Sequence, residues 1–385
     1  MPPSPVAVER PAVAAPSRIA FLDIARVVAT LTMLMGHTID ALLGPLYRTG
    51  PAFAVWTFFR ALTPSTFLFV SGFVLGVVTL RELPVDGLTP AATKRLRRFA
   101  FYLALGYVLH LPVDTLRQLV TLPAERWRPF FAVDVLQCVA VTLAVLQLVV
   151  LVGRTRVRIG WMAATVAAAV GLATPWVWTT TDALAVPTWL RGYLSPAAGA
   201  LFPLFPWIGL PAAGLAFAMW YAGDPAAHPG RRALATFAPV GAACLAAAGL
   251  MRWLVWEPVG TGVGPSRPSQ FVLQIGIVCL LLTALAWLVG EGRRRSPLLE
   301  RFGQESLTVY VVHISIVYGS PWSHGLRWLL GVDLAPPAIG AVVLTLWSAM
   351  LLLALVWSRC KQEFPREARE VRLATFGTLA ALLIF

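Results

Sequence analysis

Long apolar runs separated by short polar loops dominate the chain. A helix needs roughly 17 to 25 residues to cross a bilayer, and most of the runs are at least that long. They cover residues of about 19–43, 52–80, 99–118, 130–152, 159–178, 196–221, 233–256, 270–290, 303–321 and 338–357, with 371–385 as a shorter candidate. The runs lack the alternation of a barrel strand, and a helix satisfies its own backbone hydrogen bonds in lipid. The pattern predicts an all-α, polytopic transmembrane helix bundle of about 10–11 spans.

Composition supports a membrane protein, and charge placement predicts its orientation. The 385 residues are 58% hydrophobic and 13% charged, with a mean hydropathy of +0.74. With the N-terminus in the cytoplasm, 21 of the 31 Lys and Arg lie on the cytoplasmic side and 7 lie outside. This distribution follows the positive-inside rule. We therefore expect a multi-pass protein of the cytoplasmic (inner) membrane, with the lipid bilayer as its partner.

The net charge of +13 is largely a consequence of this topology. The basic residues are spread over short loops, so nucleic acid is not an expected partner. Residues 1–17 are rich in Pro and Ala and lack an apolar period, which indicates a disordered cytoplasmic tail before a single domain at 18–385. The sequence contains no recognisable metal motif, no nucleotide-binding glycine loop and no paired cysteines, so no metal and no tightly bound cofactor are predicted.

The first span carries four ionisable side chains. It reads FLDIARVVATLTMLMGHTID, and at about 100° per residue Asp23, Arg26, His37 and Asp40 share one stripe. Such residues usually face a protein interior or a water-filled cavity, which predicts a polar cleft. His37 followed by Asp40 suits a catalytic base and its orienting carboxylate. The alternatives are an interfacial ion pair between Asp23 and Arg26, and a purely structural His37 in helix packing.

Polar positions in later spans are expected to line the same cleft. The second span contributes Ser71 and Gly72, although Gly72 and Gly76 also match the small-residue spacing of a close helix contact. The other cleft-lining candidates are Asp134, Gln137, Ser306, Tyr310 and His313. The last three fall on one side of a helix, for which a hydrogen-bonded helix contact is the alternative.

A basic cluster precedes the third span. Lys94, Arg95, Arg97 and Arg98 lie in the sequence KRLRR, on the predicted cytoplasmic side. Arg suits phosphate oxygens geometrically, so these side chains and Arg26 are candidates for binding a phosphorylated cosubstrate. The alternative is a topology signal that contacts lipid phosphates.

Several of these motifs together resemble a known family. They read RIAFLDIARVVATLTMLMGHTIDALL, TFLFVSGFVLG, VDVLQCVAVTLAVL and GQESLTVYVVHI. Their order and spacing resemble the bacterial membrane members of the heparan-alpha-glucosaminide N-acetyltransferase catalytic family, within the acyltransferase-3-like transmembrane acyltransferase superfamily. The resemblance is best over residues 18–150 and 298–320. Asp23, Arg26 and His37 match its first-span motif, and Phe69, Ser71 and Gly72 match its second.

The resemblance implies an enzyme. It would move an acyl group, expected to be acetyl, from cytoplasmic acyl-CoA to a sugar hydroxyl or amine of a glycan or glycolipid. His37 and Asp40 would be catalytic, and Arg26, Lys94, Arg95, Arg97 and Arg98 would bind the acyl-CoA. Acetyl-CoA would be a cosubstrate, and a homodimer is left open. The competing class is a proton-coupled transporter or flippase, because ionisable residues in spans also mark substrate pathways.

Overall fold

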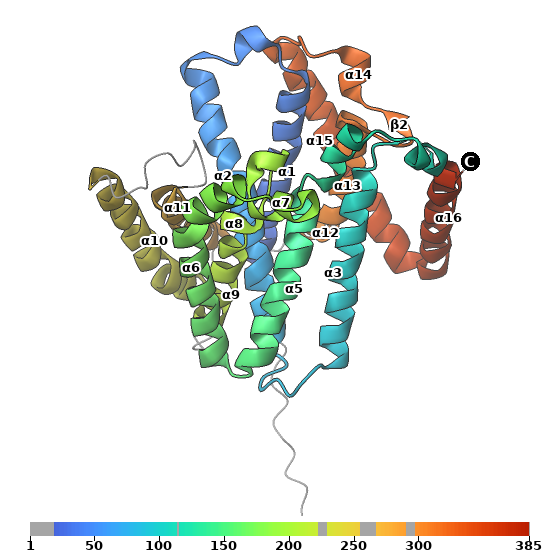
Figure 1. Cartoon of the computed structure of the whole chain (residues 1–385). Coiled ribbons are helices and arrows are strands. Elements are labelled where there is room, and N and C mark those ends of the chain that lie inside the picture. The colour runs from blue at the N-terminus through green and yellow to red at the C-terminus, as the bar shows by residue number, and fades with distance from the viewer. Residues whose placement is uncertain (1–18, 114, 222–228, 255–266, 290–296, 385) are drawn as a thin grey trace, which may run out of the picture.

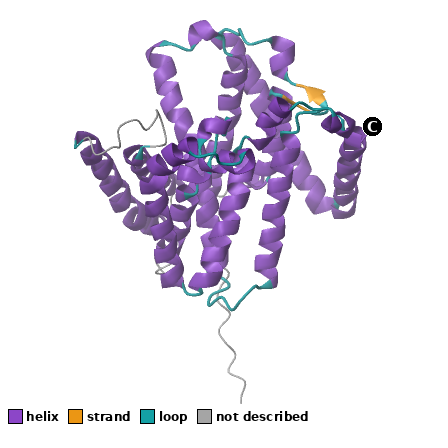
Figure 2. Cartoon of the chain, viewed as in Figure 1, coloured by secondary structure: helices purple, strands orange, loops and turns teal. Residues whose placement is uncertain are grey.

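The computed structural model describes residues 19–113, 115–221, 229–254, 267–289 and 297–384. The predicted tail at 1–17 lies outside the described residues. Helices make up nearly all of the described chain, and its only paired strands form one small hairpin (Figure 2). The all-α polytopic bundle is therefore confirmed.

Eight helices of the described residues are long and apolar enough to cross a bilayer. They are α1 (Ala20–Leu42), α2 (Gly50–Thr79), α5 (Val135–Gly153), α6 (Arg156–Ala183), α8 with α9 (Leu204–Trp207 and Gly209–Tyr221), α10 (Pro229–Trp253), α11 (Pro268–Val289) and α15 (Pro336–Glu363). Two further long helices are α3 (Pro90–Leu109) and α16 (Pro365–Ile384). All of the predicted runs therefore contain helix.

Short elements connect these helices. They are η1 (Pro45–Tyr47), η2 (Leu116–Val120), η3 (Ala124–Trp127), α4 (Arg128–Phe131), α7 (Thr188–Leu194), η4 (Pro196–Ala198), α12 (Pro297–Gln304), α13 (Ser306–Val317), α14 (Leu326–Leu330), β1 (Gly319–Ser320) and β2 (Ser323–His324). The α1–α2 connection and α14 lie at the top of the bundle in Figure 1.

Three predicted spans differ from the structure. The run at 196–221 begins with η4, and its long helical part starts only at Leu204. The run at 303–321 is not one helix, because α12 and α13 meet at Glu305 and α13 is only 12 residues long, about 18 Å. The buried Glu305 carboxylate pairs with Lys361 of α15 and accepts a hydrogen bond from Thr308, which satisfies it at the break. The third helix begins at Pro90 rather than near 99. Thr89 caps it by accepting from the Ala92 N–H at 3.1 Å, and Pro90 suits its first turn.

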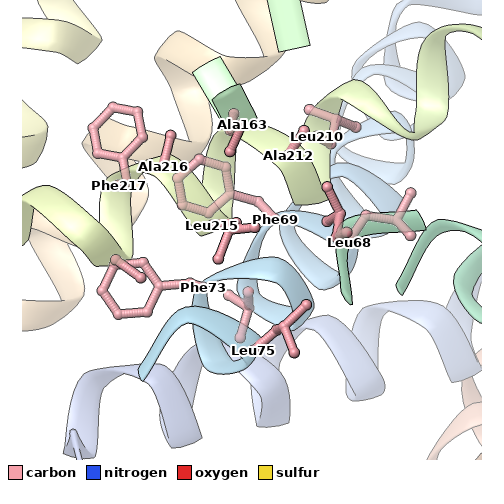
Figure 3. Packing of buried hydrophobic residues seen from close by; sticks show 14 of the residues in the cluster. Leu68, Phe69, Phe73, Leu75, Ala163, Leu210, Ala212, Leu215, Ala216 and Phe217 are labelled. Carbon is pink, nitrogen blue, oxygen red and sulfur yellow. The ribbon is translucent and has the colours of Figure 1, made fainter. Parts of the chain in front are cut away.

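The tightest packing joins α2 to α9. A Cβ on Gly72 would stand 1.9 Å from the Pro211 carbonyl oxygen, and one on Gly76 would stand 2.4 Å from the Ala218 Cβ. The helices therefore approach more closely than any larger residue would allow, as small residues permit between membrane helices. Figure 3 shows Phe69 and Phe73 of α2 packed among the apolar side chains of α9.

Helix α1 lies between two apolar clusters. Phe21, Leu22 and Ala25 belong to the cluster built mainly on α2, α5, α6, α9, α10 and α11. Leu34 and Leu42, farther along α1, belong to a second cluster with α12, α13 and α15. Helix α1 is therefore packed along most of its length, first by one cluster and then by the other.

Candidate active site

Two histidines from opposite ends of the sequence meet inside the bundle. The ring centroids of His37 on α1 and His313 on α13 lie 5.3 Å apart. Tyr318, immediately after α13, places its hydroxyl 3.4 Å from Nδ1 of His37 and 3.3 Å from the His37 carbonyl oxygen. His37 is partly exposed, whereas His313 is completely buried. The prediction that His37 and His313 face a common polar region is consistent with this geometry.

Hydrogen bonds indicate which nitrogen of each ring carries a proton. Nδ1 of His313 lies 2.8 Å from the Val309 carbonyl oxygen, which can only accept, so Nδ1 is the protonated nitrogen. The Nε2 lone pair of a neutral His313 is then buried, with no partner among the described residues. For His37, Tyr318 donates to the backbone carbonyl and so accepts from Nδ1–H. Nε2 of His37 is therefore also left with a lone pair.

A second polar group adjoins the histidines. Tyr310, one turn before His313, donates from its hydroxyl to Oδ2 of Asp134 at 3.2 Å. Nε2 of His110, at the end of α3, lies 3.7 Å from the same oxygen. Asp134 and Gln137 form a capping box at the start of α5, which fixes the carboxylate at a helix N-terminus. Residues of α1, α3, α5 and α13 therefore converge here.

The predicted pairing of His37 with Asp40 does not describe the structure. The Asp40 carboxylate forms an ion pair with Arg60 of α2, and its backbone carbonyl accepts from Arg48 at 2.9 Å. On α1, the two side chains point about 60° apart, which directs His37 toward α13 and Asp40 toward α2. The orienting contact of His37 comes from Tyr318 instead.

The other end of α1 carries Asp23 and Arg26, whose charged atoms lie 3.9 Å apart. The interfacial ion pair considered as an alternative is therefore present. Arg26 also interacts electrostatically with Arg98 and Tyr102 of α3. Nε of Arg98 donates to the Tyr102 hydroxyl at 2.5 Å. Arg26 and Arg98 are thus close enough to interact across the α1–α3 boundary, and a shared role in binding acyl-CoA stays a prediction.

The members of the basic cluster are not equivalent. Arg95 forms a two-pronged ion pair with Glu82 and donates to Gln147 at 2.8 Å, so its guanidinium is committed to protein partners. Its assignment to acyl-CoA stays a prediction, and it would require Arg95 to give up one of these contacts. Lys94, Arg97 and Arg98 are exposed, which leaves them accessible to an anion.

Besides Asp23, three predicted cleft-lining residues lie outside the histidine centre, the region where His37 and His313 meet. Gly72 is part of the α2–α9 contact, which was its alternative interpretation. The hydroxyl of Ser71 donates to the Phe67 carbonyl of its own helix at 2.8 Å. Ser306 begins α13, two turns before His313.

Sequence reasoning missed three contributors: Tyr318, His110 and Arg60. Arg60 was detectable as one of three basic residues inside predicted spans. His110 and Tyr318 have partners distant in sequence, and no local period identifies such partners.

Comparison with known proteins is consistent with the arrangement. The chain matches the family described as heparan-alpha-glucosaminide N-acetyltransferase, catalytic, over residues 18–258. The match extends beyond the predicted 18–150 and includes His37, His110 and Asp134, while α13 lies after it. No curated protein matches the chain. Because the match spans more than half of the 385 residues, the chain belongs to the heparan-alpha-glucosaminide N-acetyltransferase catalytic family, a family of acetyltransferases.

Proposed function

We propose that the chain is an integral membrane acetyltransferase that moves an acetyl group from cytoplasmic acetyl-CoA to an amine or hydroxyl of a glycan or glycolipid. The observation that carries this proposal is the meeting of His37 and His313 inside the bundle of a member of this family. The distribution of Lys and Arg supports a cytoplasmic N-terminus. The Asp23 end of α1 then faces the cytoplasm, and the His37 end lies toward the other side.

The donor site is proposed at the Arg26 end. Arg26 lies near Arg98, and the exposed Lys94 and Arg97 belong to the same end of α3. These four cations would bind the phosphates of acetyl-CoA, with the guanidinium groups forming paired hydrogen bonds to phosphate oxygens. Arg26 and His37 are eleven residues apart on the unbroken helix α1, a rise of about 16 Å. A thioester at the end of an extended arm would span this distance.

The chemistry is proposed to use His37 as the base, because its ring is partly exposed and His313 is fully buried. Nε2 of His37 would accept the proton of the acceptor amine or hydroxyl as that group attacks the thioester carbonyl. A C–N or C–O bond forms, the C–S bond breaks, and the CoA thiolate leaves and is protonated. His313 would act as a positioning residue, with its unpaired Nε2 available to share the proton held by His37.

Acetyl transfer in proteoliposomes tests this proposal. Purified chain would be incubated with labelled acetyl-CoA and two acceptors, a glucosamine-terminated saccharide and its hydroxyl-only counterpart. We expect acetylated product from at least one, and a loss of about 100-fold or more in kcat for His37→Asn. His324→Asn is the matched control, because His324 lies on the exposed hairpin and stacks on Trp328. Movement of the saccharide without an acetylated product would instead support the transporter.

The donor site has its own test. Arg26→Gln is expected to raise the KM for acetyl-CoA by about tenfold or more, since hydrogen bonds to charged groups contribute about 1.5–3 kcal/mol. Arg252→Gln is the matched control, because Arg252 is also inside a span but lies on α10 and donates to Gln270. An equal effect of both substitutions would contradict a donor site at Arg26.

A further inference from the structure

A cavity lies on a different side of α1 from His37. It has a volume of about 320 Å³, in the lower range of pockets that hold small ligands. Helices α1, α2 and α15 supply most of the lining. The lining residues are Met35, Ile39, Leu43, Tyr47, Ala52, Phe53, Trp56, Pro336, Ile339, Gly340 and Val343. No charged side chain is among them, so the cavity suits hydrocarbon.

The cavity and the histidine centre are separated by α1 itself. Met35, Ile39 and Leu43 follow a four-residue spacing on one side of the helix, and His37 points about 160° away from Ile39. Leu43, a lining residue, pairs with Leu334 in an isolated backbone bridge. Pro336 and Gly340 are exposed at its α15 wall. The cavity is therefore open at the outside of the bundle, where lipid surrounds the helices.

Positive charge lies beside this apolar space. The Cγ of Arg60 and the ring of Trp56, a lining residue, both lie within 4.0 Å of the position of a Cβ on Gly36. Arg48 donates from Nε to the carbonyl oxygen of Leu43, another lining residue, at 3.0 Å. The Asp40 carboxylate pairs with Arg60. The side chains of Arg48, Arg60 and Asp40 together carry a net charge of +1.

We propose that this cavity binds one acyl chain of an anionic phospholipid, whose phosphate pairs with Arg60. Arg48 donates to the backbone carbonyls of Leu43 and Asp40 and adds positive charge beside this pair. The apolar lining accounts for the chain, and the net charge of +1 complements a phosphate diester, which carries one negative charge. Arg60 is 46% exposed at its side chain, so it reaches a headgroup without losing Asp40. Arg presents several N–H donors in a planar fork, which allows one guanidinium to serve both groups.

Gly340 provides a direct way to fill the cavity. No atom lies within 4 Å of the position of a Cβ on Gly340, so a leucine there enters the space without a backbone clash. Gly249 of α10 also has open space at its Cβ and lies outside the cavity lining. Gly340→Leu and Gly249→Leu are thus a matched pair that adds the same side chain to two helices.

Native mass spectrometry of the full chain, stripped of lipid in detergent, tests the proposal. The protein would be titrated with phosphatidylglycerol and with phosphatidylcholine of identical chains. We expect one phosphatidylglycerol per chain to be retained under activation that removes phosphatidylcholine. Gly340→Leu should weaken this binding by about tenfold or more, the factor that corresponds to about 1.4 kcal/mol, and Gly249→Leu should leave it unchanged. Equal binding to wild type and Gly340→Leu would overturn the proposal.

The headgroup is tested separately. Arg60→Gln should reduce the preference for phosphatidylglycerol about fivefold, since one basic residue near an anionic lipid surface contributes about 1 kcal/mol. Arg60→Lys should retain most of it. Glycerol phosphate, which lacks acyl chains, should not compete. Equal retention of both lipids by the wild type, or competition by glycerol phosphate, would overturn the assignment. The readout is bound lipid, so it is independent of the proposed acetyl transfer.

Discussion

The α2–α9–α10 contact and the histidine centre are both buried, but they are built differently. In the first, Phe237 of α10 stacks on Phe217 with a centroid distance of 5.4 Å, and α2 approaches α9 through its glycines. In the second, the rings of His37 and His313 meet, and the buried Nε2 of His313 has no partner among the described residues. The apolar contact is closely packed by nonpolar side chains. In the histidine centre, a buried ring nitrogen has no hydrogen-bond partner among the described residues. We therefore expect the stability of the fold to depend on the apolar contact, and acetyl transfer to depend on the histidine centre.

Replacing His313 should separate activity from stability most strongly. His313→Asn is expected to lower kcat by about 100-fold or more, because it removes the lone pair beside His37. The amide can still donate to Val309, so the Tm of the purified protein should change little. Unchanged KM for acetyl-CoA and an altered pH–rate profile would distinguish positioning from a structural defect. A fall in Tm that accounts for the whole loss of activity would show that His313 contributes to stability rather than to catalysis.

A substitution in the apolar contact is expected to lower stability and to leave activity intact. Phe237→Ala should lower the free energy of unfolding by about 3–5 kcal/mol, because the ring is completely buried among aromatic neighbours. Thermal unfolding in one detergent would measure this, with Phe58→Ala as the control, since Phe58 is 47% exposed on α2. Activity per folded molecule should persist. Equal destabilisation by both substitutions would show that burial in this cluster does not set stability.

A single methyl group tests the close approach of α2 and α9. Gly72→Ala should destabilise the fold by about 1–3 kcal/mol, because the new Cβ would stand 1.9 Å from the Pro211 carbonyl oxygen. Gly249→Ala on α10 should instead be neutral or stabilise by up to about 1 kcal/mol, the helix propensity difference, since nothing lies near its Cβ. Thermal unfolding compares the two. Equal Tm shifts would contradict the close contact.

The smallest expected effect concerns Tyr318. Tyr318→Phe removes the hydroxyl that lies 3.4 Å from Nδ1 of His37, a long hydrogen bond. A net contribution of about 0.5–1.5 kcal/mol predicts a loss of roughly two- to twelvefold in kcat. Steady-state kinetics would measure it. Tyr193→Phe is the control, because it removes a hydroxyl that lies 2.9 Å from the Tyr107 hydroxyl, outside the histidine centre. A loss as large as that of His37→Asn would assign Tyr318 a direct role in catalysis.

Sequence periodicity predicted the structural features that depend on residues close together along the chain. The helical bundle, the polar stripe of α1 and the glycine contact of α2 follow from spacings of three or four residues. Polar partners depend on tertiary packing, which periodicity does not encode. Tyr318 is 281 residues from His37, and Tyr310 is 176 from Asp134. Asp40 is an example. Its spacing of one helical turn suggested His37 as its partner, but in the folded chain its carboxylate pairs with Arg60.

His37 and His313 are proposed to act as one unit in acetyl transfer. A double-mutant cycle on kcat with His37→Asn, His313→Asn and the combined variant tests it directly. Residues that act as a unit are strongly non-additive, so the double variant should be about as slow as the slower single variant. If the loss of kcat in the double variant equals the product of the two single losses, the two imidazoles act independently, which contradicts their action as one unit.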